Sequence, residues 1–193
     1  MHTATYSTLF ASGTETVIKP VFRVLIAYED FSAGRHARET YDFLTRQLGG
    51  ELMFDLEMWN FDVLRNAKLR EMAVRDAVAA DLIIVSSHGV GEVPFGFKAW
   101  IDTWATGDFK AIALVNLVDR QKDQKIKPST IRAHLQRVAL EARVGFFAQP
   151  DEWPEAEGIP DTLQISHRVS QTSAMMANLI QQHAPASRFA ITA

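Results

Sequence analysis

The strongest constraint on the fold is a repeated alternation of short strand-like runs with stretches of helical periodicity. Most of the runs are apolar and too short for buried helices, and one alternates apolar and charged residues. The predicted strands are Val21–Tyr28, Glu51–Trp59, Leu82–Val85, Phe109–Leu117 and Val144–Ala148. Parallel strands need helical crossovers, and these are right-handed. The pattern therefore predicts a single α/β domain with a doubly wound, five-stranded parallel sheet.

The strand order expected for such a sheet is 2-1-3-4-5, the flavodoxin-like arrangement, with its switch point between the first and third strands. The loops after Tyr28 and Val85 are therefore expected to face each other. The helices are expected to turn these residues inward: Ala37, Tyr41, Leu44, Leu48, Leu69, Met72, Ala73, Ala77, Phe97, Trp100, Ile101, Trp104, Ile131, Leu135 and Val138.

Glycine, proline and other turn-forming residues set the expected boundaries of the helices and loops. Glu29–Arg35 is predicted as a loop, with the first helix beginning after Gly34 and ending at Gly49. Pro94 suits a first helical turn, and residues 128–130 open the fourth helix. A last helix is predicted over 169–180. Residues 1–20 are expected to be a tail or arm, 21–184 the domain and 185–193 a second tail.

Composition limits the classes of function. The chain has 193 residues, 47% of them hydrophobic, and a net charge of −3, which suits one domain and gives no basic surface for nucleic acid. It has no cysteine, which excludes disulfides and thiolate chemistry. No apolar run reaches the length of a membrane span, and the start lacks the features of a secretory signal. We therefore expect a cytoplasmic protein that binds neither nucleic acid nor membrane.

The segment from Asp81 to Asp102 reads as a buried strand, a polar loop and a helix. In open α/β sheets ligands bind at the carboxyl ends of the strands, so this loop is expected to form one wall of any site. The expected site combines Glu29 to His36, Ser86 to Glu92 and Asn116 to Asp119.

This segment resembles the second flavin-contacting motif of NADPH-dependent FMN reductases, a family of the flavodoxin-like superfamily. The spacing of that motif is kept by Ala80, Asp81, Val93, Pro94, Lys98 and Asp102. The next strand, Lys110–Val115, resembles the strand that follows the motif in that family, and the resemblance covers about the middle third of the chain. It implies an FMN-dependent NAD(P)H oxidoreductase in which the flavin carries the hydride chemistry.

The resemblance implies that FMN would be held by Ser32, Gly34, Arg35, His36, Ser86, Ser87, His88, Gly89, Gly91 and Asn116. The residues of the first loop would hold the phosphate, and those from Ser87 onward would run along the isoalloxazine. No catalytic side chain is identified, and a flavin or nicotinamide ligand is the expected small-molecule partner. The chain departs from the family at Ser87–Val90, which replaces Pro-Glu-Tyr-Asn, and at Asn116–Asp119, which lacks the family's glycines. Glu29 and Asp30 would also repel a phosphate. The alternative is therefore a degenerate site, in which the ability to bind FMN has been lost.

A second resemblance, to response-regulator receiver domains, rests on Val24–Asp30 and Phe146–Pro150. Ser86 and Ser87 stand where that family has its phosphoryl-accepting Asp, and Gln149 replaces its Lys. This resemblance implies a non-phosphorylatable receiver. The alternative function is therefore a non-enzymatic regulatory or adaptor domain.

Such an adaptor is expected to present a surface to a partner or to a second copy near Trp100 and Trp104. The acidic pair of the first loop, Glu29 and Asp30, could hold a hard cation but is more typical of a solvated loop or a helix N-terminus, so no metal site is assigned. Ser87 and His88 are not a nucleophile and its base, because neighbouring residues at a strand end point in opposite directions.

Overall fold

A computed structural model of the chain describes residues 19–50, 52–89, 91–118, 130–148 and 178. Within these residues one parallel sheet runs in the order β2-β1-β3-β4-β5. Its strands are β1 (Val21–Tyr28), β2 (Met53–Asn60), β3 (Leu82–Ser87), β4 (Ala113–Val118) and β5 (Gly145–Ala148). This is the flavodoxin-like α/β fold, so the predicted fold class and strand order are confirmed.

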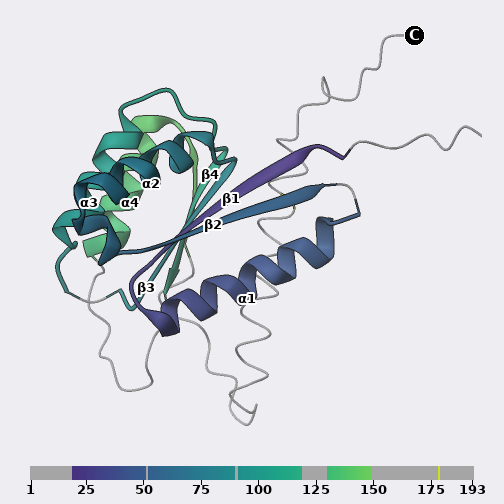
Figure 1. The fold of residues 1–193 in the computed structure, drawn as a ribbon, viewed down its shortest axis with the longest axis horizontal. Helices are drawn as coiled ribbons and strands as arrows, with labels where there is room; N and C mark the ends of the chain where they lie inside the picture. The colour runs from purple at the N-terminus through teal and green to yellow at the C-terminus, as the bar shows by residue number, and fades with distance from the viewer. Residues whose placement is uncertain (1–18, 51, 90, 119–129, 149–177, 179–193) are drawn as a thin grey trace, which may run out of the picture.

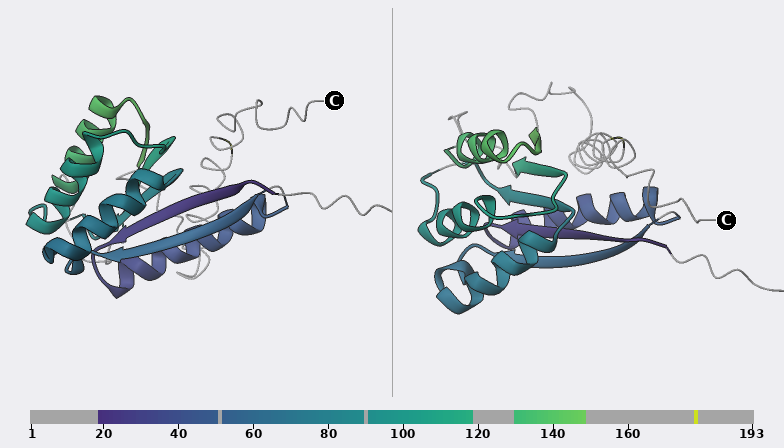
Figure 2. Two further views of the ribbon diagram at one scale, coloured as in Figure 1. Left: turned by 45° about the horizontal axis from the view of Figure 1, so that its top comes forward. Right: turned by 90° about the horizontal axis from the view of Figure 1, so that it is seen from above.

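Helices cover both faces of the sheet (Figures 1 and 2). One face carries α1 (Phe31–Leu48), and the other carries α2 (Ala67–Ala79), α3 (Phe95–Ala105) and α4 (Thr130–Ala142). A short 3-10 turn, η1 (Val63–Arg65), lies between β2 and α2. Each face buries its own apolar cluster, because successive side chains of a strand point to opposite faces.

The predicted inward residues of α1, α3 and α4 are all buried. The prediction was wrong for Met72 of α2, which is 46% exposed. Ala73 and Ala77 are the buried residues of α2, and Met72 lies about 100° around the helix from Ala73.

Two predicted strand boundaries shift for reasons of pairing. β3 continues through Ser86 and Ser87, which pair with Leu117 and Val118 of β4 rather than opening a loop. β4 begins at Ala113 instead of Phe109, because β3 begins only at Leu82, the partner of Ala113. The half-exposed second strand does lie at an edge of the sheet, as its alternation predicted.

The first helix begins earlier than predicted. α1 starts at Phe31 rather than after Gly34, because the carboxylate of Asp30 accepts the backbone N–H of Ala33 at 3.0 Å and caps the helix. The predicted phosphate-binding loop is therefore largely helix. Gly34 is buried against Tyr28, where an added Cβ would lie 2.8 Å from the ring.

β1 and β3 are joined beyond their ladder by a reciprocal contact at the amino edge. A side-chain oxygen of Asp81 accepts the backbone N–H of Arg23 at 2.8 Å, and the backbone N–H of Asp81 donates to the carbonyl of Arg23 at 2.8 Å. Asp81 of the reductase-like motif thus has a structural partner in this chain.

The start of α3 lies against η1. A Cβ on Gly96 would lie 2.8 Å from the backbone nitrogen of Arg65 and from the carbonyl carbon of Leu64, so only glycine allows this approach. Most of the predicted tails, and the last predicted helix apart from Asn178, lie outside the described residues. Among the described helices, none is long and apolar enough to cross a membrane.

Candidate functional site

The loops that follow β1 and β3 meet at the carboxyl edge of the sheet, as predicted. The backbone N–H of Glu29 donates to the carbonyl of Ser86 at 3.0 Å. In return, the carboxylate of Glu29 accepts the backbone N–H of His88 at 2.8 Å. The amide side chain of Asn60, at the end of β2, donates to the carbonyl of Glu29 at 3.3 Å. The switch point of the sheet is therefore held together by the chain's own polar groups.

Asp30 forms a second link between the same loops. Its carboxylate caps α1 and also lies 2.8 Å from Nε2 of His88. The backbone N–H of Ala33 is the largest influence that holds the pKa of Asp30 below its usual value, and the His88 side chain adds to it against the opposing effect of burial. Asp30 is therefore an anion at neutral pH, with half of its side chain (52%) exposed.

The predicted phosphate-binding residues lie in the first two turns of α1. Anions bind helix N-termini through free backbone N–H groups. Here the N–H of Ala33 is engaged by the Asp30 carboxylate, and the N–H of Gly34 donates to the Asp30 carbonyl at 2.8 Å. Ser32 and His36 are partly buried and Arg35 is exposed. The N–H groups of Ala33 and Gly34 at the start of α1 thus both have partners on Asp30.

Three buried polar side chains lie near the carboxyl ends of β3 and β4. Ser86, Ser87 and Asn116 are fully buried, and their side-chain oxygens have no hydrogen-bond partner among the described residues. The amide nitrogen of Asn116 donates to the carbonyl of Val85 at 3.4 Å. Strand alternation turns Ser86 toward α1 and Ser87 toward the opposite face. These groups are held inside the sheet layers rather than on an open surface.

Gly89 and Gly91 serve the backbone of the loop between β3 and α3. Their φ angles are +72° and +87°, a region that L residues rarely adopt. The carbonyl of Gly91 also accepts the hydroxyl of Thr130, the first residue of α4. Both glycines shape the loop, which is a sufficient reason for their presence.

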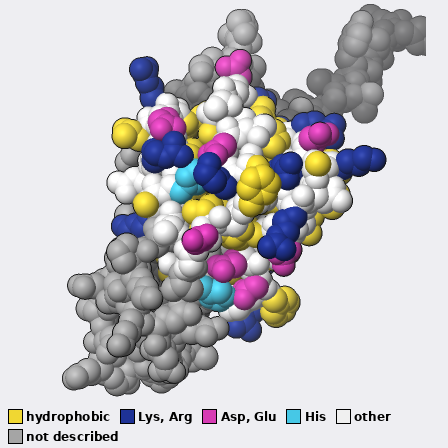
Figure 3. Space-filling view, turned by 90° about the vertical axis from the view of Figure 1, so that its left-hand side faces the viewer, with side chains coloured by type: hydrophobic (Ala, Val, Ile, Leu, Met, Phe, Trp, Pro, Cys, Tyr) yellow, Lys and Arg dark blue, Asp and Glu magenta, His cyan; other side chains and the backbone are white. Residues whose placement is uncertain are grey.

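Exposed apolar side chains gather at the same edge, and sequence reasoning missed them. Phe31 and Phe95, the first residues of α1 and α3, are 83% and 82% exposed, and Val63 of η1 is 37% exposed. The available signal was an aromatic residue directly after each loop and outside the inward helical pattern. Figure 3 shows hydrophobic side chains exposed between acidic and basic ones on the side of the molecule that carries α2, α3 and α4.

The three tryptophans among the described residues pack in the core or against it. Trp100 and Trp104 are 0% and 1% exposed, so their side chains are not available to a partner. Trp59 packs against the same cluster and donates from its indole nitrogen to Asp76 of α2 at 3.1 Å. The expectation of a surface near Trp100 and Trp104 therefore finds no support in these side chains, which fill the space beneath α3.

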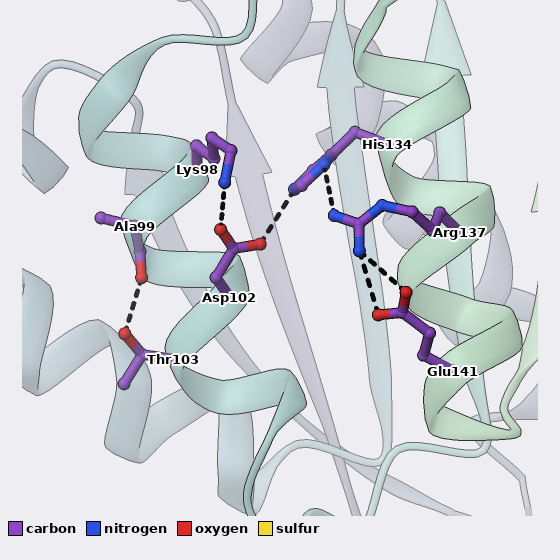
Figure 4. Close-up of polar contacts among 7 residues, drawn as sticks. All are labelled: Lys98, Ala99, Asp102, Thr103, His134, Arg137 and Glu141. Carbon is purple, nitrogen blue, oxygen red and sulfur yellow. Dashed lines mark hydrogen bonds and ion pairs between the residues drawn. The ribbon is translucent and has the colours of Figure 1, made fainter.

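A separate polar cluster joins α3 to α4 (Figure 4). Asp102 contacts Lys98 on its own helix and lies 3.2 Å from Nε2 of His134 on α4. Arg137 donates to Nδ1 of His134 at 3.1 Å and pairs with Glu141 at 2.9 Å. Because Nδ1 accepts a hydrogen bond, the imidazole is the neutral tautomer with its proton on Nε2. The ring N–H is not well aligned with the Asp102 oxygen, so this contact is mainly electrostatic.

The pKa values of this cluster agree with the geometry. Burial is the largest influence on His134 and, with the charges of Arg137 and Lys98, holds its pKa below the usual value despite Asp102. Burial would raise the pKa of Asp102, but the hydrogen bond and charge of Lys98, followed by His134 and Arg137, outweigh it and lower that pKa. In the described part of the chain, no group of three or more His, Asp or Glu side chains is arranged to hold a metal ion.

Comparison with known proteins supports the fold. No protein-family model matches the chain, and no curated protein matches it in sequence. The solved structure of Smu.1420 from Streptococcus mutans UA159 is similar, with a TM-score of 0.51 and 11% identity over 81% of this chain and 100% of that one. A short-chain flavodoxin associated with a bacterial microcompartment gives a TM-score of 0.46 and 11% identity over 82% and 99%. At 11% identity, the similarity to Smu.1420 shows that the two chains share a fold and nothing more.

Proposed function

We propose that this chain is a non-enzymatic binding domain, a regulatory or adaptor module built on the flavodoxin-like fold. The observation that carries the proposal is the 2.8 Å hydrogen bond from the His88 backbone N–H to the Glu29 carboxylate, beside the Asp30 carboxylate that caps α1. These contacts use the backbone donors that a phosphate would need at this end of the sheet.

Electrostatics supports this reading. A flavin phosphate carries between one and two negative charges and would approach Glu29 and Asp30. Two like charges about 4 Å apart repel by roughly 1 kcal/mol in bulk water and about 4 kcal/mol near a protein surface. Displacing the carboxylates would also leave the His88 and Ala33 N–H groups without partners. Arg35, in the second turn of α1, is exposed.

The purified full chain tests this proposal. We expect no flavin absorbance, no saturable binding of FMN or NADPH, and no rise in melting temperature with either ligand. Glu29→Gln is the informative variant, because glutamine keeps an oxygen to accept the His88 N–H and removes the charge. Saturable FMN binding by the unaltered chain, with reduction of the bound flavin by NADPH, would overturn the proposal.

A second candidate is an FMN-dependent NAD(P)H oxidoreductase, the activity implied by the reductase-like motif. The observation in its favour is that the buried side-chain oxygens of Ser86, Ser87 and Asn116, near the ends of β3 and β4, have no hydrogen-bond partner among the residues that the structure describes, since buried polar atoms normally have partners. A flavin would supply the hydride chemistry and these residues would orient it. This candidate predicts FMN binding that Ser87→Ala weakens by about tenfold, which corresponds to the loss of one hydrogen bond.

A further inference from the structure

We propose that His134 is a proton-controlled switch that sets how α4 is held against α3 and against the loop between β3 and α3. This loop forms one wall of the candidate site, so the switch would make the shape of that wall depend on pH. The inference goes beyond the proposed function, because it needs no ligand or partner and applies to any molecule that the site binds.

His134 lies between two groups of opposite charge on two helices. Its Nε2 atom is 3.2 Å from a carboxylate oxygen of Asp102 on α3, and its Nδ1 atom accepts a hydrogen bond of 3.1 Å from Arg137 on α4 (Figure 4). The side chain of His134 is 9% exposed, so water has little access to the ring. Asp102 and Arg137 therefore supply the direct polar contacts of the imidazole.

Protonation of the ring is incompatible with the present contact to Arg137. In the neutral tautomer Nδ1 carries the lone pair that accepts the guanidinium N–H, whereas in the imidazolium both ring nitrogens carry hydrogen. The new Nδ1–H would face the guanidinium N–H across the same 3.1 Å, so that two donors and two positive charges oppose each other. The hydrogen bond would be lost, and Arg137 would move away from the ring.

The cluster offers a second arrangement for the protonated ring. Arg137 also donates to both carboxylate oxygens of Glu141, at 2.9 and 3.1 Å, so it can leave the ring and keep this partner. On the other side, the ring N–H is not well aligned with Asp102, and a positive ring would be drawn into a charge-assisted hydrogen bond there. Protonation thus exchanges Arg137 for Asp102, which gives the cluster two discrete arrangements.

The surrounding charges set the direction of the switch. Asp102 favours the charged ring, whereas burial, Arg137 and Lys98 oppose it, and Lys98 also contacts Asp102. The strands β4 and β5, which pack against α4 as well, carry no titratable side chain. The ring is therefore neutral at pH 7 and gains its proton below pH 6.5, the ordinary midpoint of histidine.

Thr130 connects α4 to the candidate site. It precedes His134 by four residues, so the two side chains lie on the same face of α4. The hydroxyl of Thr130 donates to the carbonyl of Gly91 in the loop between β3 and α3. Two polar contacts, one helical turn apart, therefore tie α4 to the segment that contains this loop and α3. A shift of α4 at His134 would act on the Gly91 carbonyl.

An NMR titration of the full chain tests the inference. We expect three signals to change with one shared midpoint below pH 6.5: the imidazole of His134, the side-chain Nε–H of Arg137 and the amide of Gly91. His134→Asn cannot gain a proton and should abolish the responses of Arg137 and Gly91 at this midpoint. His88 lies in the same loop and titrates in both chains, so its contribution cancels in the comparison.

Arg137→Met distinguishes a switch from a purely structural contact. Methionine keeps an unbranched apolar stem and removes the guanidinium, so protonation of His134 no longer breaks a hydrogen bond or opposes that charge. The shared midpoint of His134 and Gly91 should rise by at least about 0.5 pH unit. Arg38→Met is the matched control and should leave both midpoints unchanged. Arg38 is 53% exposed, against 52% for Arg137, and it likewise pairs with a carboxylate four residues later, on α1.

Four results would overturn the inference. They are an unchanged midpoint in Arg137→Met, a Gly91 response that persists in His134→Asn, an Arg137 signal that stays constant while His134 titrates, and a ring that remains neutral until the fold is lost. Amide spectra recorded at each pH show whether a variant is folded. If Arg137→Met does not fold, the comparison of the original chain with His134→Asn still decides. None of these midpoints depends on FMN binding, so failure of this inference and failure of the proposed function are separate results.

Discussion

The carboxylate of Glu29 accepts the backbone N–H of His88 at 2.8 Å, across 59 positions of sequence. This bond, with the Asp30 contacts, lies where a doubly wound sheet ordinarily receives its ligand. Polar groups of the chain itself thus join the two loops at the switch point. This relationship leads to the first two predictions.

Glu29→Ala should destabilise the fold by about 1–3 kcal/mol, because it leaves a partly buried backbone N–H of His88 without its charged partner. Glu29→Gln should cost less, since it keeps an acceptor oxygen. Urea denaturation measures both, with the effect expected in the midpoint at an unchanged slope. Equal stability of the alanine variant and the original chain would contradict the bond.

Asp30→Ala should cost about 0.5–2 kcal/mol through loss of the α1 cap, and Asp30→Asn should cost less because asparagine also caps helices. The lowered pKa of Asp30 adds a pH dependence. Its contribution is complete above the unfolded-state pKa near 4 and is lost as the pH falls through the lower folded-state pKa. Melting temperatures measured between neutral and acid pH should therefore fall less steeply for Asp30→Asn than for the original chain.

Gly96→Ala should destabilise the fold by about 1–3 kcal/mol, because the new methyl group would meet the backbone of Leu64 and Arg65 at 2.8 Å and neither can move freely. Gly50→Ala is the control, since nothing lies within 4 Å of its added Cβ. Thermal unfolding of the two variants compares them. A near-neutral effect at Gly96 would show that η1 and α3 do not touch as described.

His134 should titrate below its usual pKa in the folded protein, because burial is the largest influence on it and Arg137 opposes protonation. The unfolded chain then binds more protons between the folded-state value and about pH 6.5, so stability falls as the pH drops through that interval. His134→Asn should flatten this part of the stability profile. NMR titration of the imidazole measures the pKa directly, and a value above 6.5 would refute the expectation.

The sequence carried enough information for the sheet and for three of the helical faces. The short, β-branched run Leu82–Val85 predicted a buried strand, and the spacing of Phe97, Trp100, Ile101 and Trp104 predicted a helical face, and both are confirmed. The start of α1 was missed, although Asp30 three residues before Ala33 is an ordinary capping pattern. The acidic pair was interpreted as an obstacle to phosphate, a cation site or a helix N-terminal charge, but its role as a link between the two loops was not predicted.

The site was harder to predict because its features depend on three-dimensional neighbours. Gly34 looked like part of a phosphate loop, and only its contact with Tyr28 shows why glycine is there. The hydrogen bond between Glu29 and His88 joins residues far apart in sequence, which no local pattern reveals. The exposure of Phe31 and Phe95 likewise depends on where two helices begin relative to the sheet.

The contact of Asp81 with the Arg23 N–H has a counterpart at the other end of the same strand pair, where Glu29 accepts the His88 N–H. A carboxylate thus marks each end of the alignment between β1 and β3. A slip of one residue would turn every side chain of β1 to the opposite face and would also separate both carboxylates from their N–H groups. Asp81 and Glu29 therefore help to specify the register of β1 and β3, because their hydrogen bonds form only in the observed register and are lost in a shifted one.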